Sequence, residues 1–277
     1  MIDVKNISYT YMKNTPFEKI ALRDVSFGVG EGDFLAIAGH TGSGKSTLIQ
    51  IIAGLIDLEI GAVEVDGENI REKNAKRKIG IVFQYPEHQL FEETVAKDIA
   101  FGPRNLGLSE AEIAARVDES MKLVGLDAAL KDSSPFELSG GQKRRVAIAG
   151  ILTLKPKYLI FDEPTAGLDP KARRKLLSEI KKFHRAGTTI IFVSHSMEDI
   201  ANLASRVIVL AQGKILFDGA PRKLFSRKEI LDAAGLLPPP VTQLMLELKN
   251  SGLNVDAEII TLDEAEQEIL RNLPKFF

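Results

Sequence analysis

A glycine-rich turn between an apolar strand and a helix constrains this chain more than any other feature. Residues 39–46 read Gly-His-Thr-Gly-Ser-Gly-Lys-Ser and fit the pattern G-x-x-x-x-G-K-S/T. Apolar runs on either side predict a strand over 33–38 and a helix over 48–55. Glycines let the backbone curl around phosphate oxygens, and the helix N-terminus adds positive potential. The turn predicts a nucleotide-binding P-loop, in which Lys45 reaches the β- and γ-phosphates and Ser46 ligates Mg²⁺.

A second pattern supports this interpretation, because a glycine-rich turn before a helix also arises by chance. The apolar strand predicted over 158–161 ends in two carboxylates, Asp162 and Glu163. Asp162 suits the metal carboxylate that accompanies a P-loop. Glu163 suits a general base that orients and polarises a water molecule. A buried strand that ends at polar residues is common by itself, but downstream of a P-loop the pair favours nucleotide hydrolysis.

The start of the helix predicted over 143–154 has two interpretations. Leu-Ser-Gly-Gly-Gln occupies residues 138–142, and Ser139 and Gln142 have the spacing of a capping box. Capping does not explain Gly140 and Gly141, because glycine is a poor helix former. Glycines are useful there if a phosphate must approach the backbone closely at a helix N-terminus.

Composition excludes several classes of protein. The 36 Lys and Arg nearly balance the 38 Asp and Glu, giving a net charge of −2, which argues against a dedicated nucleic-acid binder. The chain has no cysteine, so it has no disulfide, thiol nucleophile or Cys-ligated metal. We find no uncharged apolar run of about 18 residues and no apolar core of a signal peptide. We therefore expect a cytoplasmic chain that serves a membrane only through partners.

The remaining segments predict an α/β cassette with a helical tail. A strand over 158–161, a helix over 171–185 and a strand over 188–193 form a βαβ pattern, which favours a parallel sheet. Between 93 and 150 the hydrophobic period is helical. Two helical stripes follow Pro221, and they comprise Val241, Leu244, Met245 and Leu248, and then Leu262, Ala265, Ile269 and Leu273.

The order of these motifs over residues 1 to 220 resembles the ATP-binding-cassette (ABC) ATPases. The resemblance implies a P-loop NTPase fold: a RecA-like mixed sheet, an antiparallel β subdomain and a helical signature subdomain at about 93–150. It also implies that 221–277 form a small C-terminal helical dimerisation region. Two cassettes of this family close around two ATP molecules, and each signature motif completes the site of the other chain.

The resemblance also implies a role for each motif residue. Glu163 would be the catalytic carboxylate, His195 the switch histidine at the γ-phosphate, and Gln84 a contact to Mg²⁺ and the attacking water. Ser46, Gln84 and Asp162 would hold the metal. The implied ATP-binding residues are Tyr11, Gly39, His40, Thr41, Gly42, Ser43, Gly44, Lys45, Ser46, Thr47, Gln84, Ser139, Gly140, Gly141, Gln142 and Asp169.

Three of these residues have a second interpretation from sequence alone. Asp169 precedes Pro170 and suits a helix N-cap as well as the D-loop of a dimer interface. His195 also suits an ordinary strand end. Tyr11 is expected to stack on adenine, but it shares a predicted strand face with Tyr9, so one of the two rings would serve packing.

Residues 83–95 and 98–103 resemble the ATPase subunits of energy-coupling-factor (ECF) importers, which take up vitamins or cobalt and nickel ions. The segment places Leu90 and Phe91 beside several glutamates, as suits a groove for basic coupling helices. The implied partners are a second ABC ATPase, identical or paralogous, an integral membrane T-component and a substrate-binding S-component, with no nucleic acid. The chain would act peripherally at the cytoplasmic face of the cell membrane. An ATPase of another ABC importer and a non-transport soluble ABC ATPase remain as alternatives.

Overall fold

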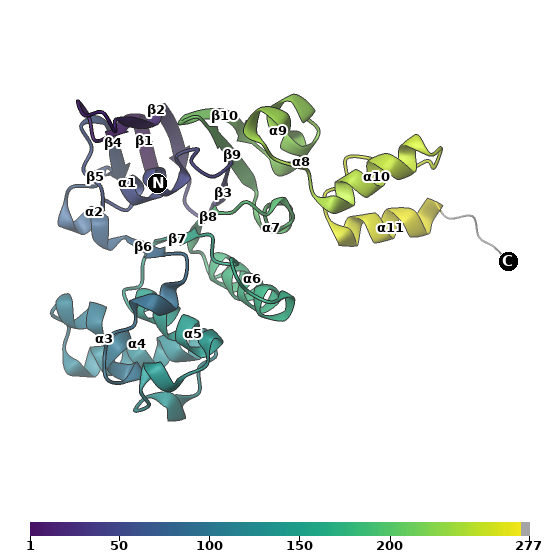
Figure 1. Cartoon of the computed structure of the whole chain (residues 1–277). Coiled ribbons are helices and arrows are strands. Elements are labelled where there is room, and N and C mark those ends of the chain that lie inside the picture. Colours follow the sequence, from purple (N-terminus) through teal and green to yellow (C-terminus); the bar gives the residue numbers. More distant parts are fainter. Residues whose placement is uncertain (273–277) are drawn as a thin grey trace.

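The computed structural model describes residues 1–272 and contains two sheets, a helical subdomain and a C-terminal helical region (Figure 1). The N-terminal sheet is antiparallel in the order β2-β1-β4-β5. Its strands are β1 (Ile2–Tyr11), β2 (Lys19–Val29), β4 (Ile60–Val65) and β5 (Glu68–Asn69).

The central sheet has six strands in the order β10-β9-β3-β8-β7-β6. All neighbours are parallel except β10, which pairs antiparallel with β9. β3, β7 and β8 are buried throughout, as their continuous apolar sequences require in a sheet covered on both faces. The strands are β3 (Phe34–Ala38), β6 (Ile79–Val82), β7 (Tyr158–Asp162), β8 (Thr189–Val193), β9 (Arg206–Ala211) and β10 (Lys214–Gly219).

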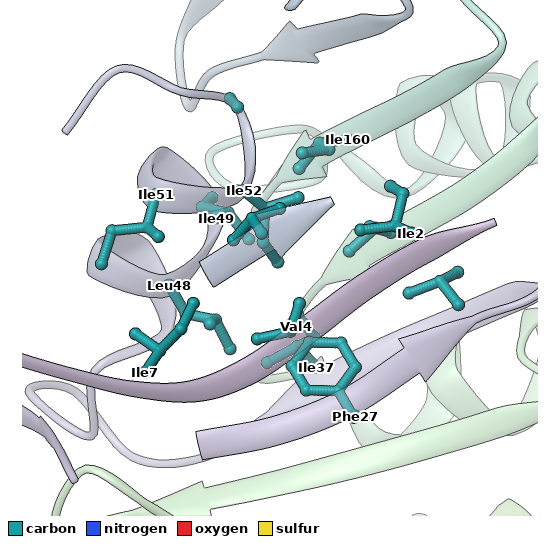
Figure 2. Close-up of a cluster of buried hydrophobic side chains, with 14 of the residues drawn as sticks. Ile2, Val4, Ile7, Phe27, Ile37, Leu48, Ile49, Ile51, Ile52 and Ile160 are labelled. Carbon is teal, nitrogen blue, oxygen red and sulfur yellow. The ribbon is translucent and has the colours of Figure 1, made fainter. Parts of the chain in front are cut away.

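Helix α1 (Lys45–Ile52) lies between the two sheets and joins them through one hydrophobic cluster (Figure 2). Leu48, Ile49, Ile51 and Ile52 of the helix are fully buried in this cluster. Its other members include Ile2, Val4 and Ile7 from β1, Ile37 from β3 and Ile160 from β7. The P-loop helix is therefore held rigidly on both sides.

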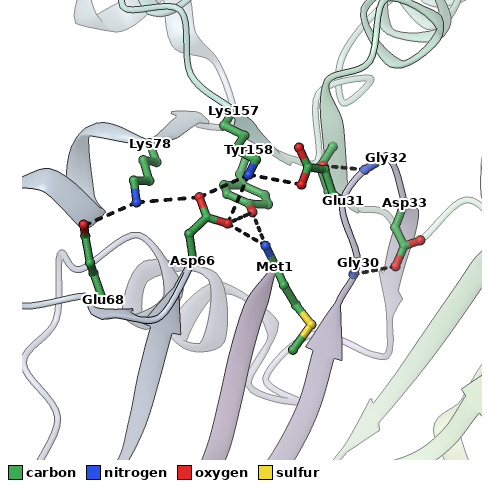
Figure 3. Close-up of polar contacts among 11 residues, drawn as sticks. Met1, Gly30, Glu31, Gly32, Asp33, Asp66, Glu68, Lys78, Lys157 and Tyr158 are labelled. Atoms are coloured by element: carbon green, nitrogen blue, oxygen red, sulfur yellow. Dashed lines mark hydrogen bonds and ion pairs between the residues drawn. The ribbon is translucent and has the colours of Figure 1, made fainter.

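A polar network closes the edge of this junction (Figure 3). Asp66, in the turn after β4, accepts hydrogen bonds from the Met1 amino group at 2.6 Å, Tyr158 at 2.6 Å and Lys157 at 3.1 Å. Burial alone would raise the pKa of Asp66, but these donors outweigh it and hold the pKa well below its usual range. The antiparallel sheet is thus tied to the start of β7.

The helical subdomain is inserted between β6 and β7. Val95, Ile99 and Val117 are among the buried residues that join its helices in a second hydrophobic cluster. Its helices are α3 (Val95–Asn105), α4 (Glu110–Leu123) and α5 (Gly140–Leu152), with short turns η1 (Pro86–Gln89), η2 (Ala128–Leu130) and η3 (Pro135–Glu137).

Helices α8 and α9 contact β9 and β10, whereas α10 and α11 share a separate cluster around Met245 and Ala265. Figure 1 shows α10 and α11 projecting from the cassette. The predicted division at residue 220 stays a prediction, and Leu273, the last residue of the predicted stripe, lies outside the described residues. The other helices are α2 (Lys73–Arg77), α6 (Pro170–Arg185), α7 (Met197–Leu203), α8 (Pro221–Phe225), α9 (Lys228–Ala234), α10 (Pro240–Asn250) and α11 (Leu262–Asn272).

Two helices begin three residues earlier than the sequence predicts. α1 begins at Lys45 because Gly44, with φ of 108°, turns the chain directly into the helix. α5 begins at Gly140 because Ser139 caps it, so both signature glycines lie in its first turn. Within residues 1–272, no helix is both long and apolar enough to cross a membrane.

Candidate nucleotide-binding site

The P-loop connects the buried end of β3 with α1 and has the backbone that a phosphate cradle requires. Gly39 has φ of 147°, and a Cβ there would lie 2.2 Å from the Leu210 carbonyl oxygen. Gly44 has φ of 108°, and a Cβ there would lie 2.6 Å from the Ala21 carbonyl oxygen. Gly42 also has positive φ, but its missing Cβ faces open space. The loop is therefore tightly packed on its protein side and open on the other, which fits a bound phosphate.

Lys45 is held inside this loop. Its side chain is buried, and Nζ donates to the carbonyl oxygens of Gly39 at 2.7 Å and His40 at 3.1 Å. Burial lowers the pKa of Lys45, while the nearby carboxylates of Glu163 and Asp162 act in the opposite direction. Since an ammonium group has three N–H donors, one remains for a phosphate oxygen.

Asp162 is the last residue of β7 and Glu163 follows it directly, at the same edge of the central sheet as the P-loop. Asp162 is 9% exposed, and burial, followed by the charge of Glu163, raises its pKa to about 6. Glu163 has φ of 46°, and its N–H donates to the Val193 carbonyl oxygen on β8. Its Oε2 lies 3.3 Å from Nδ1 of His195. The predicted base and switch histidine are thus direct neighbours.

Two clefts adjoin this cluster. One, of about 410 Å³, is lined by eleven residues, and it brings the P-loop together with the predicted adenine and water contacts. The other, of about 550 Å³, places His195 beside the opposite side of the P-loop. Lys45 and Glu163 line both clefts, and Ser43 lines neither because its side chain is buried. The predicted residues in the first cleft are Tyr11, Thr41, Gly42, Gly44, Lys45, Ser46, Thr47, Gln84 and Glu163, and those in the second are Gly39, His40, Thr41, Lys45, Glu163 and His195.

The two tyrosines of β1 have different surroundings. Tyr11 lines the first cleft, and its hydroxyl lies 3.1 Å from Oγ1 of Thr47. Tyr9 packs against the hydrophobic cluster and meets Tyr11 edge to face at 4.9 Å. Burial raises the pKa of Tyr9. Of the two rings, Tyr11 is the one available to a nucleotide base.

The signature motif, residues 138–142, lies at the start of α5 and outside both clefts. Ser139 and Gln142 form the capping box of α5, with the Gln142 N–H 3.4 Å from Ser139 Oγ and the Ser139 N–H 2.9 Å from Gln142 Oε1. No described residue of the motif lines either cleft beside the P-loop. Asp169 caps α6 through the N–H groups of Lys171 and Ala172, which lower its pKa. Capping thus accounts for the single-chain geometry of Ser139 and Asp169.

The donor set fits magnesium bound together with a nucleotide. Ser46 and Gln84 line the first cleft, and Asp162 lies close enough to Lys45 and Glu163 for their charges to shift its pKa. Hydroxyl, amide and carboxylate oxygens are ligands that Mg²⁺ accepts, and it usually completes its shell with phosphates and water. Among residues 1–272, no group of three His, Cys, Asp or Glu could hold a metal ion. A Mg²⁺ ion at this position would complete its shell with phosphate oxygens of the nucleotide.

Several lining residues escape the sequence analysis. Lys19 and Ala21 of β2 line the first cleft, and Arg173 and Ser196 line the second. None of these residues belongs to a motif with fixed spacing. Lys19, Ala21 and Arg173 reach the site because β2 and α6 pack beside it, so the sequence contains no local signal for them. Ser196, the N-cap of α7, reaches it as the neighbour of His195 in the chain.

Comparisons with known proteins agree with this geometry. Residues 22–166 match the family described as "ABC transporter". The energy-coupling factor transporter ATP-binding protein EcfA2 of Clostridium perfringens is 53% identical over 98% of this chain and 99% of its own length. EcfA2 of Caldanaerobacter subterraneus is 51% identical over 98% of this chain and 97% of its own length.

Solved structures show the same fold. The chain cbiO1 of Clostridium perfringens, part of the ABC transporter complex cbiONQ, matches with a TM-score of 0.74 and 35% identity, over 91% of this chain and 96% of that one. A dimeric ATP-binding cassette in a post-hydrolysis state, bound to ADP and Pi, matches with a TM-score of 0.70 and 31% identity, over 80% of this chain and 99% of that one. The chain therefore belongs to the ABC transporter ATPases and, within them, to the energy-coupling factor transporter ATP-binding proteins.

Proposed function

We propose that this chain hydrolyses ATP in a dimer with a second ABC ATPase, identical or paralogous, and powers an importer for vitamins or transition-metal ions. The proposal depends chiefly on the Glu163–His195 pair, which lies in a cleft beside the P-loop. The 53% identity with an energy-coupling factor subunit, over 98% of this chain, supports it. The importer would include an integral membrane T-component and a substrate-binding S-component. The chain would sit peripherally at the cytoplasmic face of the cell membrane.

The P-loop would bind the triphosphate of ATP. Backbone N–H groups of 39–47 would surround the phosphates, Lys45 would pair with the β- and γ-phosphates, and Tyr11 would stack on adenine. Ser46, Gln84 and Asp162 would hold Mg²⁺, which when bound neutralises charge that develops on the phosphates. The open face of Gly42 and the free donor of Lys45 support this arrangement.

Hydrolysis would use the carboxylate at the end of β7. Glu163 would accept a proton from water as the water oxygen bonds to the γ-phosphorus and the bond to the ADP oxygen breaks. His195 lies 3.3 Å from Glu163 and would contact the γ-phosphate from the second cleft. Gln84 would orient the same water.

A second chain would complete the site. The signature residues line neither cleft of their own chain, and they comprise Ser139, Gly140, Gly141 and Gln142. They would cap the γ-phosphate bound by the partner chain, and Asp169 would lie at the interface between the two chains. The N-terminal turn of α5 offers N–H groups and a partial positive charge for that purpose. The dimeric ADP-bound cassette with the same fold supports this assembly.

The surface of the helical subdomain offers a contact for a membrane subunit. Phe91 and Phe101 are both exposed, and their rings meet edge to face at 4.8 Å. Leu90, which the sequence also places in this groove, is instead buried in the core of the subdomain. Glu92 and Glu93 follow Phe91 directly in the chain. An apolar pair beside acidic residues suits a basic amphipathic helix from the membrane domain.

The test of hydrolysis is Glu163→Gln, which keeps the shape of the side chain but removes the base. We expect ATP affinity to persist while steady-state phosphate release falls by about 100-fold or more, the range for loss of a general base. Glu229→Gln, an exposed glutamate on α9, is the matched control and should leave turnover unchanged. Undiminished turnover in Glu163→Gln would refute the assignment.

The partners are tested separately by affinity purification of the full chain from membranes. Recovery of an integral membrane T-component supports the importer. Recovery of ribosomes or DNA would instead support a non-transport ABC ATPase. Uptake that requires no separate S-component would favour another type of ABC importer.

A further inference from the structure

Arg173, near the start of α6, takes part in a hydrogen-bond network that connects the segment after Glu163 with the segment after His195. Its Nε and Nη2 donate to Asp199 Oδ1 at 3.1 and 2.6 Å, and Nη2 also reaches Ser196 Oγ at 2.8 Å. A longer contact of 3.2 Å connects Nη2 with Glu198. One guanidinium therefore links α6 to the start of α7.

Asp199 extends this link to the segment after Glu163. Its side chain is only 2% exposed, so its carboxylate oxygens must find their hydrogen-bond donors in the protein. While Oδ1 accepts from Arg173, Oδ2 accepts from Thr165 Oγ1 at 3.1 Å. Thr165 is two residues beyond Glu163. The buried carboxylate thus holds the base-bearing segment and α6 together.

Ser196 extends the same link to the other reacting side chain. Its Oγ accepts from Arg173 and from the Asp199 N–H, and its own N–H donates to Ser194 Oγ at 3.0 Å. His195 lies between these two serines, and its side chain is 68% exposed. An exposed ring has little packing of its own to fix it, so its orientation depends on the backbone that the serines hold.

We propose that Arg173 is a positioning residue for ATP hydrolysis: through Asp199, Thr165 and Ser196 it sets the Glu163–His195 distance. The inference rests on the proposed hydrolytic function. Its physical basis is the planar guanidinium, which reaches Asp199 and Ser196 at once from fixed directions. A lysine keeps the positive charge beside Asp199 but cannot reproduce that fork. Arg173→Lys therefore separates geometry from charge.

The kinetic test measures phosphate release by the full chain under conditions in which the wild type turns over. We expect Arg173→Lys to lower kcat by about 10- to 100-fold, the effect of misplacing a reacting group by about 1 Å, with the KM for ATP changed less than about twofold. Arg174→Lys, the exposed neighbour on the same helix, is the matched control and should keep wild-type kcat. A rise in KM with kcat intact would overturn the proposal.

A double-mutant cycle separates positioning from general stability. If Arg173 acts by setting the Glu163–His195 distance, Arg173→Lys should change kcat less than about twofold in a His195→Ala background, because that pair no longer exists. The same fold-loss in both backgrounds would overturn the proposal. Asp199→Asn, which keeps the shape of the carboxylate, should show the same pattern and serves if Arg173→Lys does not fold.

A spectroscopic readout does not depend on turnover. The sequence has only four histidines, so ring signals of ¹³C-labelled histidine are assigned by single substitutions of His40, His88, His184 and His195. Arg173→Lys should shift or broaden the His195 signal and leave those of His88 and His184 unchanged. An unchanged His195 signal would overturn the inference even if the chain hydrolyses ATP. Absence of wild-type hydrolysis would instead count against the proposed function.

Discussion

Replacing Ser139 with alanine tests whether the signature serine does more than cap a helix. The chain contains a second capping box with nearly the same geometry, Ser109 and Glu112 at the start of α4. In both boxes the N3 N–H lies 3.4 Å from the serine oxygen. The serine hydroxyl donates to Glu112 at 2.7 Å and to Gln142 at 2.8 Å. Ser109→Ala is therefore a matched control for Ser139→Ala.

The stability cost should be similar for the two variants. Loss of a serine N-cap costs about 1 kcal/mol. In a protein of this size that corresponds to a fall in Tm of about 2 to 4 °C. The Ser109 box carries a charged partner, and hydrogen bonds from Ser109 lower the pKa of Glu112, so its loss should be at least as large.

The effect on turnover should differ between the variants. A hydrogen bond to a charged phosphate contributes about 1.5 to 3 kcal/mol, but the Ser139 hydroxyl must first give up Gln142 at a cost of about 1 kcal/mol. The net loss of about 0.5 to 2 kcal/mol corresponds to turnover about 2- to 30-fold slower in Ser139→Ala. Ser109→Ala should keep wild-type turnover, because α4 is remote from phosphate chemistry.

The assay combines thermal unfolding with steady-state phosphate release at saturating ATP. Equal falls in Tm with slower turnover only in Ser139→Ala would support the role in phosphate binding. Equal turnover in the two variants would refute the reasoning, and helix capping would then explain Ser139 completely.

Two further predictions concern the P-loop and the metal site. Gly39→Ala places a methyl group 2.2 Å from the Leu210 carbonyl oxygen, so we expect unfolding free energy to fall by about 2 to 5 kcal/mol through backbone strain and overpacking. Gly67 also has positive φ, but a Cβ there would meet no atom within 4 Å, so Gly67→Ala is the control. In urea denaturation it should lower the unfolding free energy less than Gly39→Ala does, and equal losses would contradict this reasoning. Burial and the charge of Glu163 raise the pKa of Asp162 to about 6. Because a carboxyl group binds Mg²⁺ well only when it is ionised, we expect the Mg²⁺-dependent affinity for ATP to fall as the pH is lowered through 6. In a calorimetric titration, Asp162→Asn should remove this pH dependence of ATP affinity. If the affinity of the variant fell as steeply with pH as that of the wild type, the pH dependence would belong to another group.

The P-loop was predictable because its chemistry lies in one contiguous segment. Phosphate binding needs glycines, a lysine and a hydroxyl at fixed spacing between a strand and a helix, and residues 39–47 satisfy this locally. The same holds for Asp162 and Glu163, which follow an apolar strand directly. Element boundaries were less exact, because Gly44 and Ser139 start their helices earlier than the apolar period indicates.

The sequence by itself therefore determined which residues suit phosphate, metal and proton chemistry, along with the α/β class. Only the tertiary structure decided which of them meet. Parallel pairing of β3, β8 and β7 brings Lys45, Glu163 and His195 to one sheet edge, and β1 places Tyr11 rather than Tyr9 at the cleft. Arg173 contacts Asp199 across 26 positions of sequence. The reason is physical: periodicity and turn chemistry act over a few residues, whereas these contacts depend on how whole elements pack.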